Sequence, residues 1–319
     1  MEYTVFLLAA GFGTRLRPLT SYRPKPLLPL LGFPMARYAV EWLRQHGHDR
    51  IIVNAHHLWE NIATWSEKEK LGLQVELPDI LGTGGGLRAA KDKMADRFLV
   101  WNGDIVSNIS PTTLLDACPD DGAAMALRYH HDLQKITRLL TDENGIVQRI
   151  GNVCQTADAP ALPHTPDGLH FTGIHAMSRK SLQYVGEGFQ CIVRSTYKEL
   201  IPQQKVVGVR HHGAWFDTGV PKEYFDANMK ALSGELPLSF DPWQFASERF
   251  EDSFVHYTAS VEGKVEGCIV GEKAVIPRDA QLRNCIVWDS VVVPEGIHHD
   301  GIFFDGGFLS IYEEENNAL

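Results

Sequence analysis

The sequence predicts an α/β fold with a parallel sheet, followed by a smaller domain of short β segments. In the first third of the chain, short apolar runs alternate with longer amphipathic stretches, which is the β-α-β pattern of a parallel sheet. Beyond Gly234 the pattern changes to apolar pairs that recur about every six residues, as in a hexapeptide β-helix. We therefore expect one domain over residues 1–234 and a second over residues 250–310.

Glycines mark the ends of the first two predicted helices, and apolar runs mark the strands around them. The amphipathic stretch at residues 35–46 ends at Gly47, and the one at 59–70 ends at Gly72. A third helix is expected over residues 87–94, after a glycine-rich segment. Strands are expected at residues 5–8, 51–53, 73–77, 98–101 and 123–129, and a hairpin with its turn at residues 142–145.

Composition indicates a globular protein. No apolar run reaches the roughly 18 residues that a membrane span needs. The five cysteines include no CxxC pair, which argues against a zinc site and a disulfide scaffold. The formal net charge of -10 opposes non-specific binding to nucleic acid or to an anionic membrane. We expect a cytoplasmic protein without nucleic-acid or membrane partners.

The first predicted strand leads into a glycine loop that suits an anionic ligand. Gly11 and Gly13 allow bare backbone amides to face an anion, and Arg15 and Lys25 follow with positive charge. A dinucleotide-binding loop would have a third glycine where Leu16 stands, and a P-loop would end in Gly-Lys-Ser/Thr, which is absent. The loop is therefore predicted to bind phosphate in another way.

Two later segments also follow predicted strands. The glycine-rich residues 82–86 would let backbone approach a flat ring or a phosphate, although a helical turn without a ligand is the alternative. Asp104 follows the strand at residues 98–101, and a carboxylate there can hold magnesium through oxygen. Ligands in parallel sheets bind at the carboxyl ends of strands, so both segments are candidates for the site.

Three motifs resemble one enzyme family, the sugar-1-phosphate nucleotidyltransferases. Residues 11–18 resemble its motif Gly-x-Gly-Thr-Arg-Leu-x-Pro, and Lys25-Pro26 its following Lys-Pro. Residues 215–221 resemble its Trp-x-Asp-x-Gly-x-Pro motif, and residues 172–174 its Thr-Gly-Ile strand. The resemblance implies a Rossmann-like fold of the nucleotide-diphospho-sugar transferase type. That fold has a mixed, mainly parallel sheet flanked by helices, here with a small C-terminal left-handed β-helix-like domain.

The resemblance also implies roles for the matching residues. Catalytic roles are implied for Arg15, Lys25, Asp104 and Asp217, and the two aspartates are the implied ligands of Mg²⁺. Nucleotide binding is implied for Leu8, Ala9, Ala10, Gly11, Gly13, Thr14, Arg15, Gly82 and Thr83. Sugar binding is implied for Asn102, Thr172 and Gly173.

The implied reaction transfers a nucleoside monophosphate from an NTP to a sugar 1-phosphate, giving an NDP-sugar and pyrophosphate. A regulatory subunit that binds a sugar nucleotide without turnover is the alternative. The four catalytic residues are all present, which favours the enzyme.

The base and the sugar stay open. Residues 83–86 resemble N-acetylmuramic acid 1-phosphate uridylyltransferases, whereas the C-terminal repeats resemble mannose-1-phosphate guanylyltransferases. Residues 149–152 replace a Glu-Lys pair that many members use to hold the sugar and its phosphate. The resemblance further implies a C-terminal domain that serves assembly into a homo-oligomer, with a β appendage lacking a partner as the alternative. All motif residues precede Gly234, so we expect the chemistry to survive removal of this domain.

Overall fold

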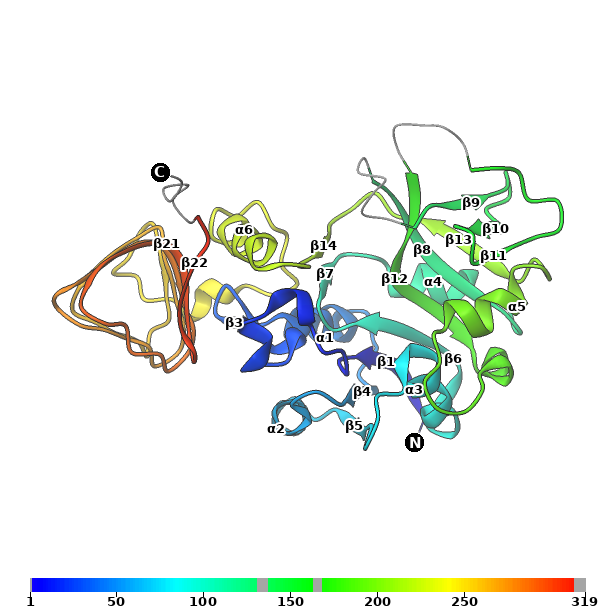
Figure 1. Ribbon diagram of the computed structural model, residues 1–319, viewed down its shortest axis with the longest axis horizontal. Helices are drawn as coiled ribbons and strands as arrows, with labels where there is room; N and C mark the ends of the chain where they lie inside the picture. Colours follow the sequence, from blue (N-terminus) through cyan, green and yellow to red (C-terminus); the bar gives the residue numbers. More distant parts are fainter. Residues whose placement is uncertain (1, 131–136, 163–167, 313–319) are drawn as a thin grey trace, which may run out of the picture. The chain divides into compact units, whose positions relative to one another are not determined.

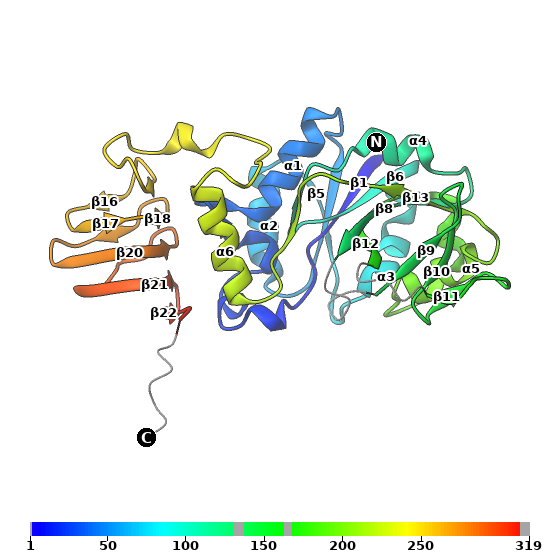
Figure 2. The same ribbon diagram turned by 90° about the horizontal axis from the view of Figure 1, so that it is seen from above.

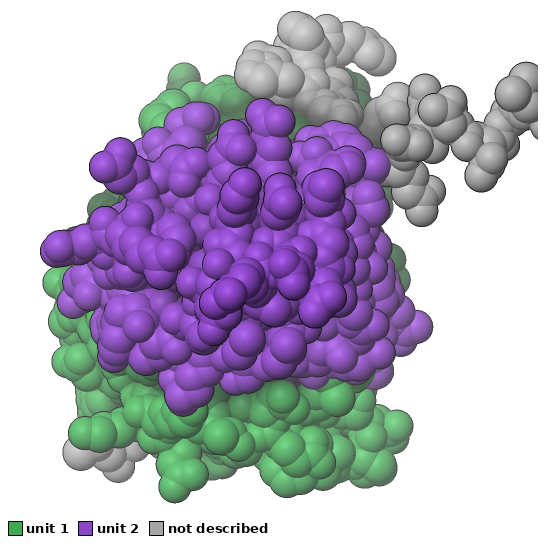
Figure 3. Space-filling model, turned by 90° about the vertical axis from the view of Figure 1, so that its left-hand side faces the viewer, with its two compact units in different colours: residues 1–11, 39–103, 107–215 green, residues 12–38, 104–106, 216–319 purple. Residues whose placement is uncertain are grey.

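The structure is a computed structural model that describes residues 2–130, 137–162 and 168–312. The chain forms two compact units, which Figure 3 colours separately. Unit 1 comprises residues 1–11, 39–103 and 107–215, and unit 2 comprises residues 12–38, 104–106 and 216–319. Each unit is thus assembled from separate parts of the sequence. No helix in the described part of the chain is long and apolar enough to cross a membrane.

A seven-stranded sheet forms the centre of unit 1, in the order β13-β8-β12-β6-β1-β4-β5 (Figure 1). β1 is parallel to both β4 and β6, β13 is parallel to β8, and β12 is antiparallel to its two neighbours. The mixed, mainly parallel sheet predicted from the sequence is therefore confirmed. Its strands are β1 (Tyr3–Leu8), β4 (Ile51–Ala55), β5 (Gly72–Val75), β6 (Met94–Asn102), β8 (Ala123–His130), β12 (Gly168–Ser178) and β13 (Val206–Arg210).

Several shorter strands lie outside the seven-stranded sheet. The predicted hairpin is confirmed, because β9 pairs antiparallel with β10. β7 and β14 form a separate two-stranded sheet. The bounds of these strands are β7 (Ile105–Ser107), β9 (Leu139–Thr141), β10 (Val147–Ile150), β11 (Cys154–Gln155) and β14 (Trp215–Asp217).

The first two predicted helices are confirmed, and the third begins earlier than expected. The helices are α1 (Met35–Gln45), α2 (Trp59–Lys68), α3 (Gly82–Ala90), α4 (Pro111–Ala117), α5 (Lys198–Leu200) and α6 (Pro221–Leu232). The third helix, predicted over residues 87–94, is present with different bounds: α3 already includes the preceding glycines and ends at Ala90, and Met94 begins β6.

Close packing explains why the glycines of α3 are helical. The amide of Gly84 donates to the carbonyl of Gln190 at 2.8 Å. A Cβ on Gly85 would lie 2.4 Å from the carbonyl oxygen of Gly188, and one on Gly86 would lie 2.6 Å from Glu76 Oε1. Glycine in a helix costs about 1 kcal/mol relative to alanine, and this close approach offsets the cost.

The C-terminal part of unit 2 is a stack of parallel coils with a triangular outline (Figure 1). Phe254 pairs with Ile269, Ile269 with Ile286, and Ile286 with Ile302. Each coil is therefore close to three of the predicted six-residue repeats, and the β-helix-like domain is confirmed. Figure 2 shows the strands of successive coils side by side.

The coil strands are β15 (Phe254–Val255), β16 (Ser260–Val261), β17 (Lys264–Glu266), β18 (Ile269–Val270), β19 (Val275–Ile276), β20 (Ala280–Val287), β21 (Gly296–Phe304) and β22 (Gly307–Ser310). β22 turns back antiparallel on β21. A small hairpin, β2 (Pro29–Leu30) with β3 (Phe33–Pro34), lies in the N-terminal part of unit 2.

One apolar core joins the coils to the rest of unit 2. It contains residues from the N-terminal segment, such as Leu16 and Tyr38, and Tyr224 of α6. It also contains coil residues, among them Phe254 and Trp288, which are buried. The domain boundary predicted near Gly234 therefore separates residues that share a core. Residues 1–234 alone would lack the coil half of this core.

Candidate active site

Lys25 lies between two carboxylates in unit 2. Its Nζ is 2.6 Å from Asp104 Oδ2 and 2.9 Å from Asp217 Oδ1, and its side chain is only 11% exposed. Burial disfavours the ammonium ion, but the negative charges of Asp104 and Asp217 outweigh burial and raise the pKa of Lys25. Lys25 is therefore charged, and both carboxylates converge on the same cation.

Local structure explains how these three residues meet. Lys25 begins a 3₁₀ turn over Lys25–Leu27, flanked by Pro24 and Pro26, which restrict its backbone. Asp104 lies between β6 and β7, and Asp217 is the last residue of β14. Since β7 and β14 pair with each other, both aspartates come from the ends of neighbouring strands.

This donor set fits a magnesium ion that is bound together with a substrate. The described residues contain no group of three or more metal-ligating side chains that would form a cage. Mg²⁺ is usually held by one or two carboxylates, with phosphate oxygens and water completing its shell. Two carboxylates converging on one point meet that requirement.

The second half of the glycine loop lies in unit 2 with Arg15. Gly13 has φ 59°, and a Cβ there would lie 2.8 Å from Cγ2 of Thr20, whose hydroxyl donates to the Gly13 carbonyl. Gly13 is thus required by the fold of the loop. Arg15 is exposed, and its Nη1 would lie 3.2 Å from a Cβ placed on Gly219. Arg15 therefore lies beside the segment that carries Asp217.

In unit 1, the residues after β1 are connected to the start of α3. The Ala9 amide donates to Asn54 Oδ1 at 2.8 Å, and Asn54 Nδ2 donates to Glu76 Oε1 at 2.7 Å. Glu76 Oε2 accepts from the Leu81 amide at 2.8 Å. Sequence reasoning missed Asn54 and Glu76, although a polar residue within or directly after a buried apolar strand was a signal for them.

Gly11 differs from the glycines of α3. Apart from its chain neighbours, no atom of the described residues lies within 4 Å of a Cβ placed on Gly11. The surrounding protein therefore does not require a glycine here, whereas a ligand that crosses the backbone would. Gly82, by contrast, has φ 68° and a Cβ there would lie 2.8 Å from the Gln190 carbonyl, so the fold itself requires it. Thr83 is partly exposed at the start of α3.

The structure brings two of the three predicted sugar-binding residues together. A Cβ on Gly173, which has φ 89°, would lie 2.9 Å from Asn102 Oδ1. This oxygen is buried and has no hydrogen-bond partner among the described residues. The hydroxyl of Thr172 is buried, donates to the Ala126 carbonyl and accepts from the Ile174 amide, so it is occupied within the sheet.

Arg128 is a cation near this strand that sequence reasoning missed. It lies on β8 opposite His170, and its Nη1 donates to the Trp215 carbonyl at 3.0 Å. Its guanidinium lies 5.1 Å above the Trp215 ring, whose Nε1 donates to the Thr172 carbonyl. Burial lowers the pKa of Arg128, and its partners among the described residues are the carbonyl and the ring of Trp215. The sequence analysis predicted only a strand over residues 123–129 and assigned no role to this arginine.

Comparison with known proteins agrees with these motifs. A family model described as nucleotidyl transferase matches residues 4–139. The chain is 27% identical over 255 residues to a UTP–glucose-1-phosphate uridylyltransferase of Synechocystis, covering 72% of this chain and 63% of the relative. It is 27% identical over 305 residues to a mannose-1-phosphate guanylyltransferase of Mycobacterium tuberculosis, covering 91% and 81%. Residues 4–139 thus match a nucleotidyl transferase domain, and most of the chain is similar to sugar-1-phosphate nucleotidyltransferases.

Some relatives extend well beyond the region that they share with this chain. The chain is 29% identical to the bifunctional protein GlmU of Methanocaldococcus jannaschii, but it spans only 53% of that relative. Among solved structures, HddC from Yersinia pseudotuberculosis shares the fold, with a TM-score of 0.58, 23% identity and coverage of 72% of this chain and 99% of that chain. The nucleotidyltransferase match at residues 4–139 includes Arg15, Lys25 and Asp104 but ends before Asp217.

Proposed function

We propose that this protein transfers a nucleoside monophosphate from an NTP to a sugar 1-phosphate, with Mg²⁺, and releases pyrophosphate. The observation that carries the proposal is the convergence of Asp104 and Asp217 on Lys25. The two relatives compared above are named for uridylyl transfer to glucose 1-phosphate and guanylyl transfer to mannose 1-phosphate.

In this reaction an oxygen of the sugar phosphate attacks the α-phosphorus of the NTP, and the bond to the β-phosphate breaks. Such chemistry needs positioning and charge neutralisation more than a protein nucleophile. Asp104 and Asp217 would hold Mg²⁺, which stabilises the charge on the phosphate oxygens. Lys25 neutralises the reacting phosphates, and Arg15 stabilises the departing pyrophosphate beside the amides of the glycine loop. Gly82 and Thr83 contact the base.

The experiment that tests the proposal is a screen of the common NTPs against sugar 1-phosphates, with pyrophosphate release as the readout and EDTA as the control. One pair should release pyrophosphate only with Mg²⁺ present. A chain that binds NDP-sugars but releases no pyrophosphate with any pair would instead be the regulatory subunit. The screen also identifies the base and the sugar.

Replacing Arg15 and Lys25 by alanine should affect different steps. Arg15 has a forked guanidinium suited to the oxygens of pyrophosphate, whereas Lys25 carries a point charge between the two metal-binding aspartates. We expect Arg15→Ala to weaken NTP and pyrophosphate binding together. Lys25→Ala should lower turnover more than it lowers NTP affinity. Calorimetric titration with NTP, combined with forward and reverse kinetics, measures both effects. Unchanged binding of both ligands by Arg15→Ala would argue against the loop as the phosphate site.

Arg128→Gln should raise the KM for the sugar 1-phosphate about tenfold. We propose that Arg128 supplies the positive charge that the Glu-Lys pair supplies in many family members, because its partners among the described residues are uncharged and it lies beside the Thr172–Gly173 strand. A charge-assisted hydrogen bond contributes about 1.5–3 kcal/mol, which is tenfold or more. Arg97→Gln, which removes a surface pair with Asp120, is the matched control. Steady-state kinetics should show an unchanged KM for NTP; an unchanged KM for the sugar phosphate would contradict the role.

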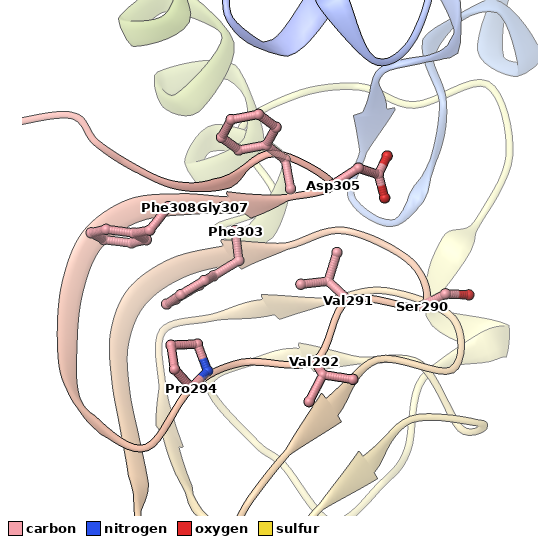
Figure 4. A pocket seen from close by; sticks show the side chains of 9 residues that line it. Ser290, Val291, Val292, Pro294, Phe303, Asp305, Gly307 and Phe308 are labelled. Atoms are coloured by element: carbon pink, nitrogen blue, oxygen red, sulfur yellow. The ribbon is translucent and has the colours of Figure 1, made fainter.

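We also propose a cytoplasmic location and self-assembly through the coils. All five cysteines are free thiols, as is usual in a reducing compartment. The coils expose apolar side chains, with Val292 67% and Phe308 41% exposed, and both line a cavity of about 400 Å³ (Figure 4). Exposed apolar patches of this kind are typical of protein contacts. Light scattering of the full chain tests whether a second copy binds there.

A further inference from the structure

Arg23 connects residues 22–29, which we call the Lys25 segment, to the coils at residues 254–310, which also belong to unit 2. It precedes Lys25 by two residues, and its side chain is only 17% exposed. Its Nη1 forms an ion pair with Asp289, and its Nε lies 3.0 Å from Asp305 Oδ2. Its guanidinium carbon lies 4.7 Å above the ring of Trp288. We call Trp288, Asp289 and Asp305 the Arg23-binding residues.

The Arg23-binding residues come from successive coils. Trp288 and Asp289 follow β20, whereas Asp305 follows β21, and Figure 4 shows Asp305 at the turn that leads to β22. Both strands are paired along their lengths in the coil stack. The two carboxylates are therefore fixed by the coil backbone, and together they hold the planar guanidinium in one orientation.

The same coils contact the Lys25 segment at two further points, once directly and once through Tyr224 of α6. Tyr22 packs edge-on against Phe304, with ring centroids 5.4 Å apart. On the other side of Lys25, the Tyr224 hydroxyl donates to the Pro29 carbonyl, and it accepts from Trp288 Nε1 at 3.2 Å. Trp288 is fully buried between these contacts. The segment is thus attached to the coils before and after Lys25.

This attachment matters because a lysine side chain has a flexible four-carbon stem. For Nζ to reach both Asp104 and Asp217, the backbone of Lys25 must be fixed. Pro24 joins Arg23 directly to Lys25 and has a restricted φ, so little freedom remains between the two residues. An ion pair at Arg23 therefore restricts where the Lys25 backbone can lie.

We propose that the coils position the catalytic lysine: Arg23, held by Trp288, Asp289 and Asp305, fixes the backbone of Lys25 so that its ammonium lies between Asp104 and Asp217. These four residues are positioning residues, because they act through Lys25. The value of this arrangement for turnover rests on the function proposed above. The placement of Lys25 itself can be measured without any reaction.

The test compares Arg23→Ala and the double variant Asp289→Asn with Asp305→Asn against a matched control. Arg283→Ala serves as the control, since Arg283 lies in a coil and pairs with Glu266 at 3.7 Å on the exposed surface. Reductive methylation of the full-length protein, without substrate, is followed at each lysine by peptide mass spectrometry. Lys222, which pairs with Asp226 on α6, is the internal reference.

Lys25 should be methylated several-fold faster in Arg23→Ala and in the double variant, and at the wild-type rate in Arg283→Ala. The rate at Lys222 should not change in any variant. Melting temperatures establish that the variants are folded; if Arg23→Ala is not, Arg23→Lys and the single Asp305→Asn variant take its place. A folded variant with the wild-type rate at Lys25 would overturn the proposal.

Kinetics then separate positioning from a general loss of stability. Turnover should fall between about tenfold and a hundredfold, as for a misplaced catalytic group, with the KM for NTP within about twofold of wild type. In a Lys25→Ala background, Arg23→Ala should cause no further loss, whereas a purely structural role would still lower turnover. Faster labelling of Lys25 with unchanged turnover would confirm the placement and refute the catalytic role proposed for Lys25.

Discussion

Asp217→Asn should lower turnover about a hundredfold and leave the protein folded. The side chain is 36% exposed at the end of β14, so an amide of the same size fits without disturbing a core. The amide lacks the negative charge that would hold Mg²⁺ at the reacting phosphate. Loss of a preorganised electrostatic contact of this kind costs on the order of 3 kcal/mol, which is about a hundredfold in rate.

The measurement is the rate of pyrophosphate release over a magnesium titration, together with thermal melting. Asp104→Asn should behave in the same way, because both carboxylates contact Lys25. Asp226→Asn is the matched control, since it removes an exposed carboxylate that pairs with Lys222 on α6. An Asp217→Asn variant within a few-fold of wild type at limiting magnesium would refute the ligand assignment.

A chain that ends at Gly234 should lose the native structure of unit 2 and all turnover. Phe254, Ile286 and Trp288 belong to the core that also contains Tyr38 and Tyr224, and all five side chains are buried. Each large apolar side chain contributes about 1.5–3 kcal/mol when buried, while a whole domain is stable by only about 5–15 kcal/mol. The structure thus leads us to expect the opposite of the sequence-based prediction that the chemistry survives.

Near-ultraviolet circular dichroism, thermal melting and pyrophosphate release together decide between these expectations. A chain that ends at Tyr312 is the matched control, because it keeps every residue of the shared core. A truncation at Gly234 that melts cooperatively and turns over like the wild type would show that the boundary predicted from the sequence is a true domain boundary.

The sequence by itself determined the parts of this protein that depend on neighbouring residues. The sequence predicted a buried strand at Val5–Leu7 and an amphipathic helix at α1. Both predictions were possible because the spacing of apolar residues along the chain distinguishes a strand from a helix. The hairpin of β9 and β10 followed from a turn sequence, and the coils followed from a six-residue repeat. The family motif likewise lies in short, continuous segments.

Only the tertiary structure decided which distant residues meet. α3 begins at Gly82 because its glycines pack against residues 188–190, far away in the chain. The pair of Asn54 and Glu76, and the ion pairs of Arg23 with two coils, leave no local periodic pattern. A buried polar side chain is favourable only when its partner is present, and that partner is supplied by long-range packing rather than by sequence neighbours.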